Sequence, residues 1–238
     1  MSSTTGRAQQ PTFLRLGLWA GIIGPLLFAL VFTIAGALTP GYSAINNAVS
    51  DLEFGATGWI QRVNFLVLGL LLILFALAFF QRIRPVLAAP WRQISAGLLV
   101  LSGAGYLLAS LFLPAARGES QRAVHAILHT VAFSLVFIPL GVACLLIGAQ
   151  LVRTNGWHNW RGFGVYSLVT GLITLFAPLG NLFSLVAPGP QTPISNPGAE
   201  FSGGGLINRV GILIAFAWLV ILAARLFRLQ ENPTKLRP

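Results

Sequence analysis

Six long apolar runs divide this chain, and they constrain its fold more than any other feature of the sequence. A helix needs about 20 mostly apolar residues to cross the hydrocarbon core of a bilayer, and each run is close to that length. Only 8% of the residues are charged, whereas soluble domains carry about 25%. The sequence therefore predicts an all-α, polytopic membrane protein with six transmembrane helices. We expect these helices over residues 13–38, 60–80, 93–114, 124–151, 162–186 and 206–227.

Both ends of the chain are polar and show no hydrophobic periodicity. We expect a disordered cytoplasmic tail over residues 1–12, a single transmembrane domain over residues 13–228 and a second cytoplasmic tail over residues 229–238. The first apolar run exceeds the roughly 7–15 residues of a signal-peptide core, so we interpret it as a membrane span.

The positive charges predict the orientation of the six helices. With helices that alternate in direction, eleven of the 15 Arg and Lys residues fall on the side that holds both termini. Loops rich in Arg and Lys stay in the cytoplasm, so both termini are predicted to be cytoplasmic and the chain to lie in the cell membrane.

The net charge of +10 would suggest a nucleic-acid partner in a soluble protein. Here the membrane topology accounts for it, so we expect membrane lipid and no nucleic acid as a partner. The sequence leaves the oligomeric state open.

Part of the sequence occurs twice, 147 positions apart, with ten identities in 28 aligned positions. The identical pairs include Glu53/Glu200, Gly58/Gly205, Ile60/Ile207, Arg62/Arg209 and Val63/Val210. Such self-similarity indicates an internal repeat. We expect three hairpins that all turn on the outer side, with helices 1–2 and 5–6 forming a parallel repeat.

Each predicted hairpin brings an acid and an arginine to its outer turn. One interpretation is that each arginine lies at the membrane interface and fixes its own loop. The other is that three guanidinium groups surround an outer vestibule suited to a phosphate or carboxylate head group. On that hypothesis the ligand-binding residues are Arg62, Asn64, Glu53, Arg122, Arg209 and Glu200.

His125 and His129 are four residues apart, which places both imidazoles on one face of a helix. With Asp51 as a third ligand they would form a zinc site, with bound water in the fourth position. Hydrogen bonding between helices is the alternative role of the two histidines. We expect no cofactor, with zinc as the alternative.

The polar run around Ser50 and Asp51 predicts a short re-entrant helix in the first outer loop. Ser43 or Asn46 and Asn47 would cap its amino end, since these residue types accept hydrogen bonds from free backbone amides. Alternatively, Asp51 could orient one of the histidines.

Three segments together resemble a prokaryotic family catalogued as domain of unknown function 998. They are residues 40–43 with 49–52 (PGYS and VSDL), residues 125–129 (HAILH), and residues 205–210 (GLINRV) with Trp218. The resemblance extends over residues 16–226 and implies a multipass protein of six to seven helices with no established activity. The serine, aspartate and histidine pattern is also similar to intramembrane zinc hydrolases such as alkaline ceramidases, which use three histidines where this chain has two on the outer side.

These observations support three hypotheses of function. The first is an integral membrane protein that binds a lipid or small amphiphile in an extracytoplasmic pocket. The pocket would lie beneath residues 40–59 and 188–205, with Arg62, His125, His129 and Arg209 lining it. The second is a metal-dependent intramembrane hydrolase acting on lipid, and the third is a structural subunit of a membrane complex.

Overall fold

The computed structural model describes residues 12–116, 120, 123–153, 158–186 and 203–231. Over these residues the chain is helical and contains no strand. Six α-helices and one 3₁₀ helix follow one another along the chain. They are α1 (Thr12–Leu38), η1 (Val49–Glu53), α2 (Gly58–Arg82), α3 (Ala89–Ala109), α4 (Val124–Arg153), α5 (His158–Val186) and α6 (Gly204–Glu231).

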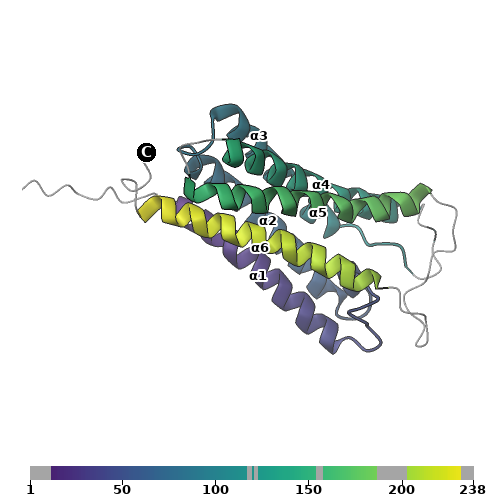
Figure 1. Ribbon diagram of the computed structural model, residues 1–238. Coiled ribbons are helices and arrows are strands. Elements are labelled where there is room, and N and C mark those ends of the chain that lie inside the picture. The colour runs from purple at the N-terminus through teal and green to yellow at the C-terminus, as the bar shows by residue number, and fades with distance from the viewer. Residues whose placement is uncertain (1–11, 117–119, 121–122, 154–157, 187–202, 232–238) are drawn as a thin grey trace, which may run out of the picture.

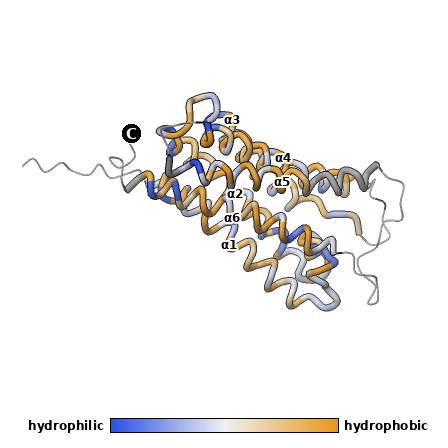
Figure 2. Tube along the Cα trace, viewed as in Figure 1, coloured by the Kyte–Doolittle hydropathy of each residue, from blue (hydrophilic) through white to orange (hydrophobic). Residues whose placement is uncertain are grey.

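The protein is a multi-pass membrane protein. Within the described residues, α1, α2, α4 and α6 are long and apolar enough to cross a bilayer. Most residues along these helices are hydrophobic, and hydrophilic residues gather near the ends (Figure 2). The prediction of an all-α membrane protein is thus confirmed, whereas six spans remain a prediction because α3 and α5 are not among these four helices.

The six helices form an elongated bundle in which each helix packs on the next along the chain, and α6 returns to pack on α1 (Figure 1). The start of α1 and the end of α6 lie at one end of the bundle, and η1 lies at the other (Figure 1). We call the latter the η1 end. Both ends of the described chain therefore lie at the same end of the bundle.

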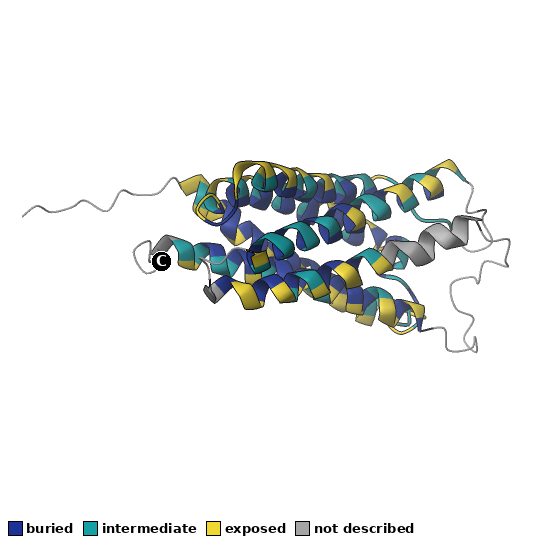
Figure 3. Ribbon diagram, turned by 45° about the horizontal axis from the view of Figure 1, so that its top comes forward, coloured by how far each residue is buried: buried dark blue, intermediate teal, exposed yellow. Residues whose placement is uncertain are grey.

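Buried residues face the axis of the bundle, and exposed residues face outward (Figure 3). The outward residues are largely apolar, as on α1, where Leu16 and Leu30 are 57% and 58% exposed. Inside, side chains join neighbouring helices by hydrogen bonds: Ser102 Oγ donates to the Val136 carbonyl at 2.8 Å, and Trp218 Nε1 donates to Ser167 Oγ at 2.8 Å. An apolar exterior around a hydrogen-bonded interior suits a lipid environment.

The most extensive helix contact joins α4 and α5 and depends on glycine. A Cβ atom at Gly148 would lie 2.8 Å from the Gly164 carbonyl, and one at Gly171 would lie 2.9 Å from the Gly141 carbonyl. Small residues allow helix backbones to approach closely in membranes. α5 packs far less on α6 than on α4, so the third predicted hairpin is not a tightly packed pair. The internal repeat remains a prediction.

Two local features differ from the sequence-based expectations. The third helix was expected over residues 93–114 but spans Ala89–Ala109. It begins early because Pro90 suits the first turn of a helix. The re-entrant helix is a single 3₁₀ helix that follows Ala48, so Ser43, Asn46 and Asn47 do not cap it directly.

Candidate functional site

The segment between α1 and α2, residues 39–57, folds over the η1 end of the bundle and is fastened to α6. The Leu206 amide donates a hydrogen bond to the Ile45 carbonyl at 2.9 Å. The Val49 amide donates to Asn208 Oδ1 at 3.1 Å. A loop from the start of the chain is thus held by a helix from its end, which fixes the position of η1.

Arg209 is the main residue that holds this loop against α6. It is 9% exposed, and its Nη1 donates to the carbonyls of Ala44 and Asn47 at 2.7 Å and of Gly205 at 2.9 Å. Its Nη2 donates to the Tyr42 hydroxyl, and the guanidinium lies 5.3 Å from the Tyr42 ring centroid. Burial raises the pKa of Tyr42 to about 12, while the Arg209 charge opposes this shift. Arg209 therefore stabilises the loop between α1 and α2, whereas the first interpretation of the arginines expected each one to fix its own loop.

Two glycines allow the loop to approach the helices closely. A Cβ atom at Gly58 would lie 1.9 Å from the Glu53 carbonyl oxygen, and one at Gly205 would lie 2.4 Å from the Asn47 carbonyl oxygen. These glycines occupy equivalent positions in the predicted repeat. Both positions thus serve the same loop, which approaches α2 on one side and α6 on the other.

Asp51 organises η1 from within. Its Oδ2 accepts a hydrogen bond from the Ala48 amide at 2.9 Å, and Asn47 Nδ2 lies 3.5 Å from the same oxygen. Burial raises the pKa of the Asp51 carboxyl, and these two hydrogen bonds and the Arg209 charge oppose the rise. The carboxylate satisfies a free amide at the start of η1.

Glu53 is the most unusual residue of the loop. It is 2% exposed, and within the described part of the chain neither carboxylate oxygen has a hydrogen-bond partner. Burial raises its pKa from 4.5 to about 8, while the Arg62 charge lowers it and the Asp51 charge raises it further. Glu53 is therefore largely protonated at neutral pH.

His129 of α4 lies beside Glu53 and is 8% exposed. Its Nδ1 is 2.6 Å from the Phe112 carbonyl oxygen and 3.9 Å from Glu53 Oε1. Because a carbonyl only accepts, Nδ1 carries the proton of this hydrogen bond. In the neutral imidazole, Nε2 is then a hydrogen-bond acceptor.

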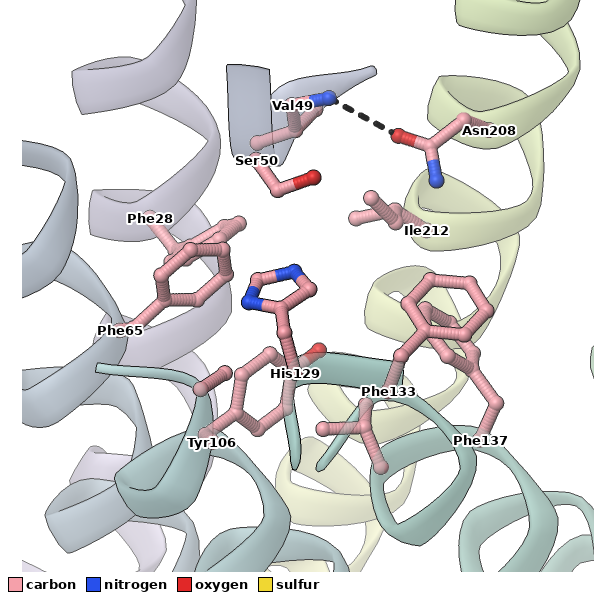
Figure 4. Close-up of a pocket in the computed structure, with 12 residues that line it drawn as sticks. Phe28, Val49, Ser50, Phe65, Tyr106, His129, Phe133, Phe137, Asn208 and Ile212 are labelled. Atoms are coloured by element: carbon pink, nitrogen blue, oxygen red, sulfur yellow. Dashed lines mark hydrogen bonds between the residues drawn. The ribbon is translucent and has the colours of Figure 1, made fainter. Parts of the chain in front are cut away.

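A cavity lies on the other side of His129. It leaves about 30 Å³ for the centres of water-sized molecules, and one water needs about 10–15 Å³. Figure 4 shows His129 pointing toward Ser50 of η1, with Asn208 of α6 nearby. The cavity is lined by Phe28, Val49, Ser50, Phe65, Tyr106, Ala109, His129, Phe133, Val136, Phe137, Asn208 and Ile212.

The remaining predicted site residues are placed differently. Arg62 is half-buried near Glu53, and its Nε has no partner within the described residues. Asn64 Nδ2 donates to the Phe28 carbonyl at 3.1 Å, which joins α2 to α1. None of Arg62, Asn64, His125 and Arg209 lines the cavity.

Arg122 and Glu200 lie outside the described residues, and so does the segment 188–202 that was expected to cover the pocket. Among residues 12–116, 120, 123–153, 158–186 and 203–231, no three His, Cys, Asp or Glu side chains form a group that could hold a metal ion. His129 Nδ1 lies 3.9 Å from Glu53 Oε1. The Asp51 carboxylate accepts a hydrogen bond from the Ala48 amide at the start of η1. The zinc site of His125, His129 and Asp51 stays a prediction.

Sequence reasoning missed Asn208, Tyr106 and the Phe112 carbonyl as parts of the site. Asn208 precedes Arg209 as Gln61 precedes Arg62, and this parallel could have indicated it. Tyr106 lies in an apolar helix where aromatic residues normally form the core. The backbone carbonyl at residue 112 leaves no signal in the sequence.

A family model described as protein of unknown function (DUF998) matches residues 22–225. The chain belongs to this family. No curated protein and no solved structure matches the chain. The match covers every described residue that lines the cavity, so the site lies within the DUF998 domain.

Proposed function

We propose that this DUF998 protein binds a lipid or small amphiphile in the cavity at the η1 end, on the extracytoplasmic side of the cell membrane. The observation that carries the proposal is the cavity itself. It brings five aromatic rings from four helices together with the polar groups of His129, Ser50, Asn208 and Tyr106. A mainly apolar cavity with few polar groups is the usual form of a small-molecule site.

The size of the cavity limits what it can hold. Space for two or three water-sized molecules suits a head group or a short apolar segment, and is too small for a whole lipid. The rest of an amphiphile would extend through the open side of the cavity and along the apolar helices. A membrane protein is surrounded by such molecules, so a lipid ligand needs no separate route of delivery.

The extracytoplasmic location depends on the predicted topology of six spans. α3 has 21 residues, and at about 1.5 Å per residue it is about 31 Å long. The hydrocarbon core of a bilayer is about 30 Å thick. α5 is longer, at 29 residues. Six crossings would place both termini on one side of the membrane and η1 on the other. The distribution of Arg and Lys predicts that the termini are on the cytoplasmic side and η1 is outside.

Photolabelling tests the proposal. The detergent-solubilised protein is exposed to C16 amphiphiles that carry a diazirine near the head and have hydroxyl, carboxylate, phosphate or trimethylammonium heads. We expect at least one of them to label residues of the cavity, identified by peptide mass spectrometry. Labelling of the cavity should decrease in the Ser50→Phe and Ala109→Phe variants, because the new phenyl rings fill the cavity from the loop and from α3.

Ala37→Phe is the matched control because Ala37 is exposed on α1 and does not line the cavity. The Ala37→Phe variant should be labelled to the same extent as the unchanged protein. Labelling spread over the lipid-facing helices, with no loss in either filled variant, would contradict the proposal.

A further inference from the structure

We propose that the cavity selects an amphiphile with an uncharged, hydroxyl-bearing head group over anionic and cationic ones, with His129 Nε2 as the hydrogen-bond acceptor. This inference rests on the proposed function and names the ligand class of the same site. It depends on which hydrogen bonds the polar groups of the cavity already make, because only the remaining donors and acceptors can bind a ligand.

The acceptor comes from the fixed tautomer of His129. The short hydrogen bond to the Phe112 carbonyl, at 2.6 Å, holds the proton on Nδ1. The outer edge of the ring faces Ser50 across the cavity (Figure 4). In the neutral ring, Nε2 therefore offers a lone pair to a ligand, and a hydroxyl proton can satisfy it.

The donor comes from Asn208. Its Oδ1 accepts the hydrogen bond from the Val49 amide at 3.1 Å, which leaves Nδ2 as the free end of the amide (Figure 4). An amide nitrogen only donates, so it requires an oxygen with a lone pair. Ser50 can donate or accept. The hydroxyl of Tyr106, another lining residue, can likewise donate or accept. A hydroxyl group, which does both, matches this set of one acceptor, one donor and two adaptable groups.

Among the residues that the structure describes, a charged head group finds no oppositely charged side chain in the cavity. None of the described lining residues is Asp, Glu, Lys or Arg. The nearby Arg209 is occupied by three carbonyls and the Tyr42 hydroxyl. Burying an unpaired charge costs far more than burying a hydrogen-bonded hydroxyl.

An anionic head group faces a second obstacle. Its oxygens would meet the Nε2 lone pair of His129, which cannot donate a hydrogen bond to them. A trimethylammonium head can be attracted by the aromatic rings, but it has no N–H or O–H group for Nε2 and no acceptor for the Asn208 amide. The set of groups therefore disfavours both signs of charge for different reasons.

Competition tests this selectivity. The photoreactive C16 alcohol is cross-linked at fixed concentration while unlabelled 1-hexadecanol, hexadecanoate, hexadecyl phosphate or hexadecyltrimethylammonium is added. We expect half-maximal displacement by hexadecanol at a concentration about tenfold or more below that of each charged competitor. This difference corresponds to about one hydrogen bond to a buried group.

His129→Phe removes the acceptor and keeps an aromatic ring, so it should remove most of the advantage of the alcohol. His129→Gln restores an acceptor and should recover part of it. If the carboxylate or the phosphate competes as well as the alcohol, the inference is wrong although cavity binding stands. If no amphiphile labels the cavity, the proposed function itself fails.

Discussion

Replacing Glu53 with glutamine should remove a pH-dependent loss of stability. The Glu53 carboxyl has a pKa of about 8 in the folded protein, against 4.5 when it is free in water. Between these values the folded state binds one proton more than the unfolded state. The free energy of unfolding should therefore fall by about 1.4 kcal/mol for each pH unit. This contribution is fully present below about pH 4.5 and is lost as the pH rises toward 8.

Glutamine resembles the protonated carboxyl and does not titrate, so Glu53→Gln should approach the stability of the unchanged protein near pH 5 and exceed it increasingly above that. One kcal/mol shifts the Tm of a chain of this size by about 2–4 °C, so the two Tm values should separate by about 3–6 °C per pH unit. The assay is thermal unfolding of the detergent-solubilised proteins between pH 5 and pH 8.

Within the described residues, the charged or ionisable groups that face Glu53 are Arg62, Asp51 and His129, and all three are present in both proteins. Glu231→Gln, which removes another carboxyl, serves as the control and should follow the unchanged protein. Parallel Tm curves for Glu53→Gln and the unchanged protein would refute the raised pKa and the protonated state of Glu53 that follows from it.

Four further substitutions test the packing of the loop and the helices. Arg209→Ala leaves loop carbonyls without a donor and should cost about 3 kcal/mol of unfolding free energy, with faster proteolysis of residues 39–57; equal stability and proteolysis would contradict its fastening role. Gly105→Ala places a Cβ atom 2.7 Å from the Val136 amide nitrogen and should cost about 1–3 kcal/mol. The control is Gly97→Ala, whose Cβ atom meets nothing within 4 Å and which should stabilise the helix by about 0.5–1 kcal/mol. A similar Tm for Gly105→Ala and Gly97→Ala would contradict the close α3–α4 packing. Asn64→Leu should lower stability by about 1 kcal/mol in the same thermal assay, because it removes a hydrogen bond between helices, and an unchanged Tm would show that this bond contributes nothing.

The fold was largely predictable from the sequence, and the site only in part. The six apolar runs correspond to six helices, and His129 and Glu53 were both candidate site residues. The predicted vestibule of arginines differs from the cavity in the structure. Arg209 donates to loop carbonyls and does not line the cavity, and the polar groups that do line it include Asn208, which the ligand-binding hypothesis did not contain.

The sequence by itself determined the class of the protein, because the length and apolar character of a helix that can enter a bilayer are local properties of the chain. It also predicted a short helix around Ser50 and Asp51, where the structure has η1. Only the tertiary structure decided which polar groups remain available to a ligand. The packing of residues 39–57 against α6 occupies Arg209 and orients Asn208, and the Phe112 carbonyl fixes the His129 tautomer. Glu53 is buried beside His129 of α4. These effects join residues up to 167 positions apart, and burial, which raises the pKa of Glu53, exists only once the helices have packed.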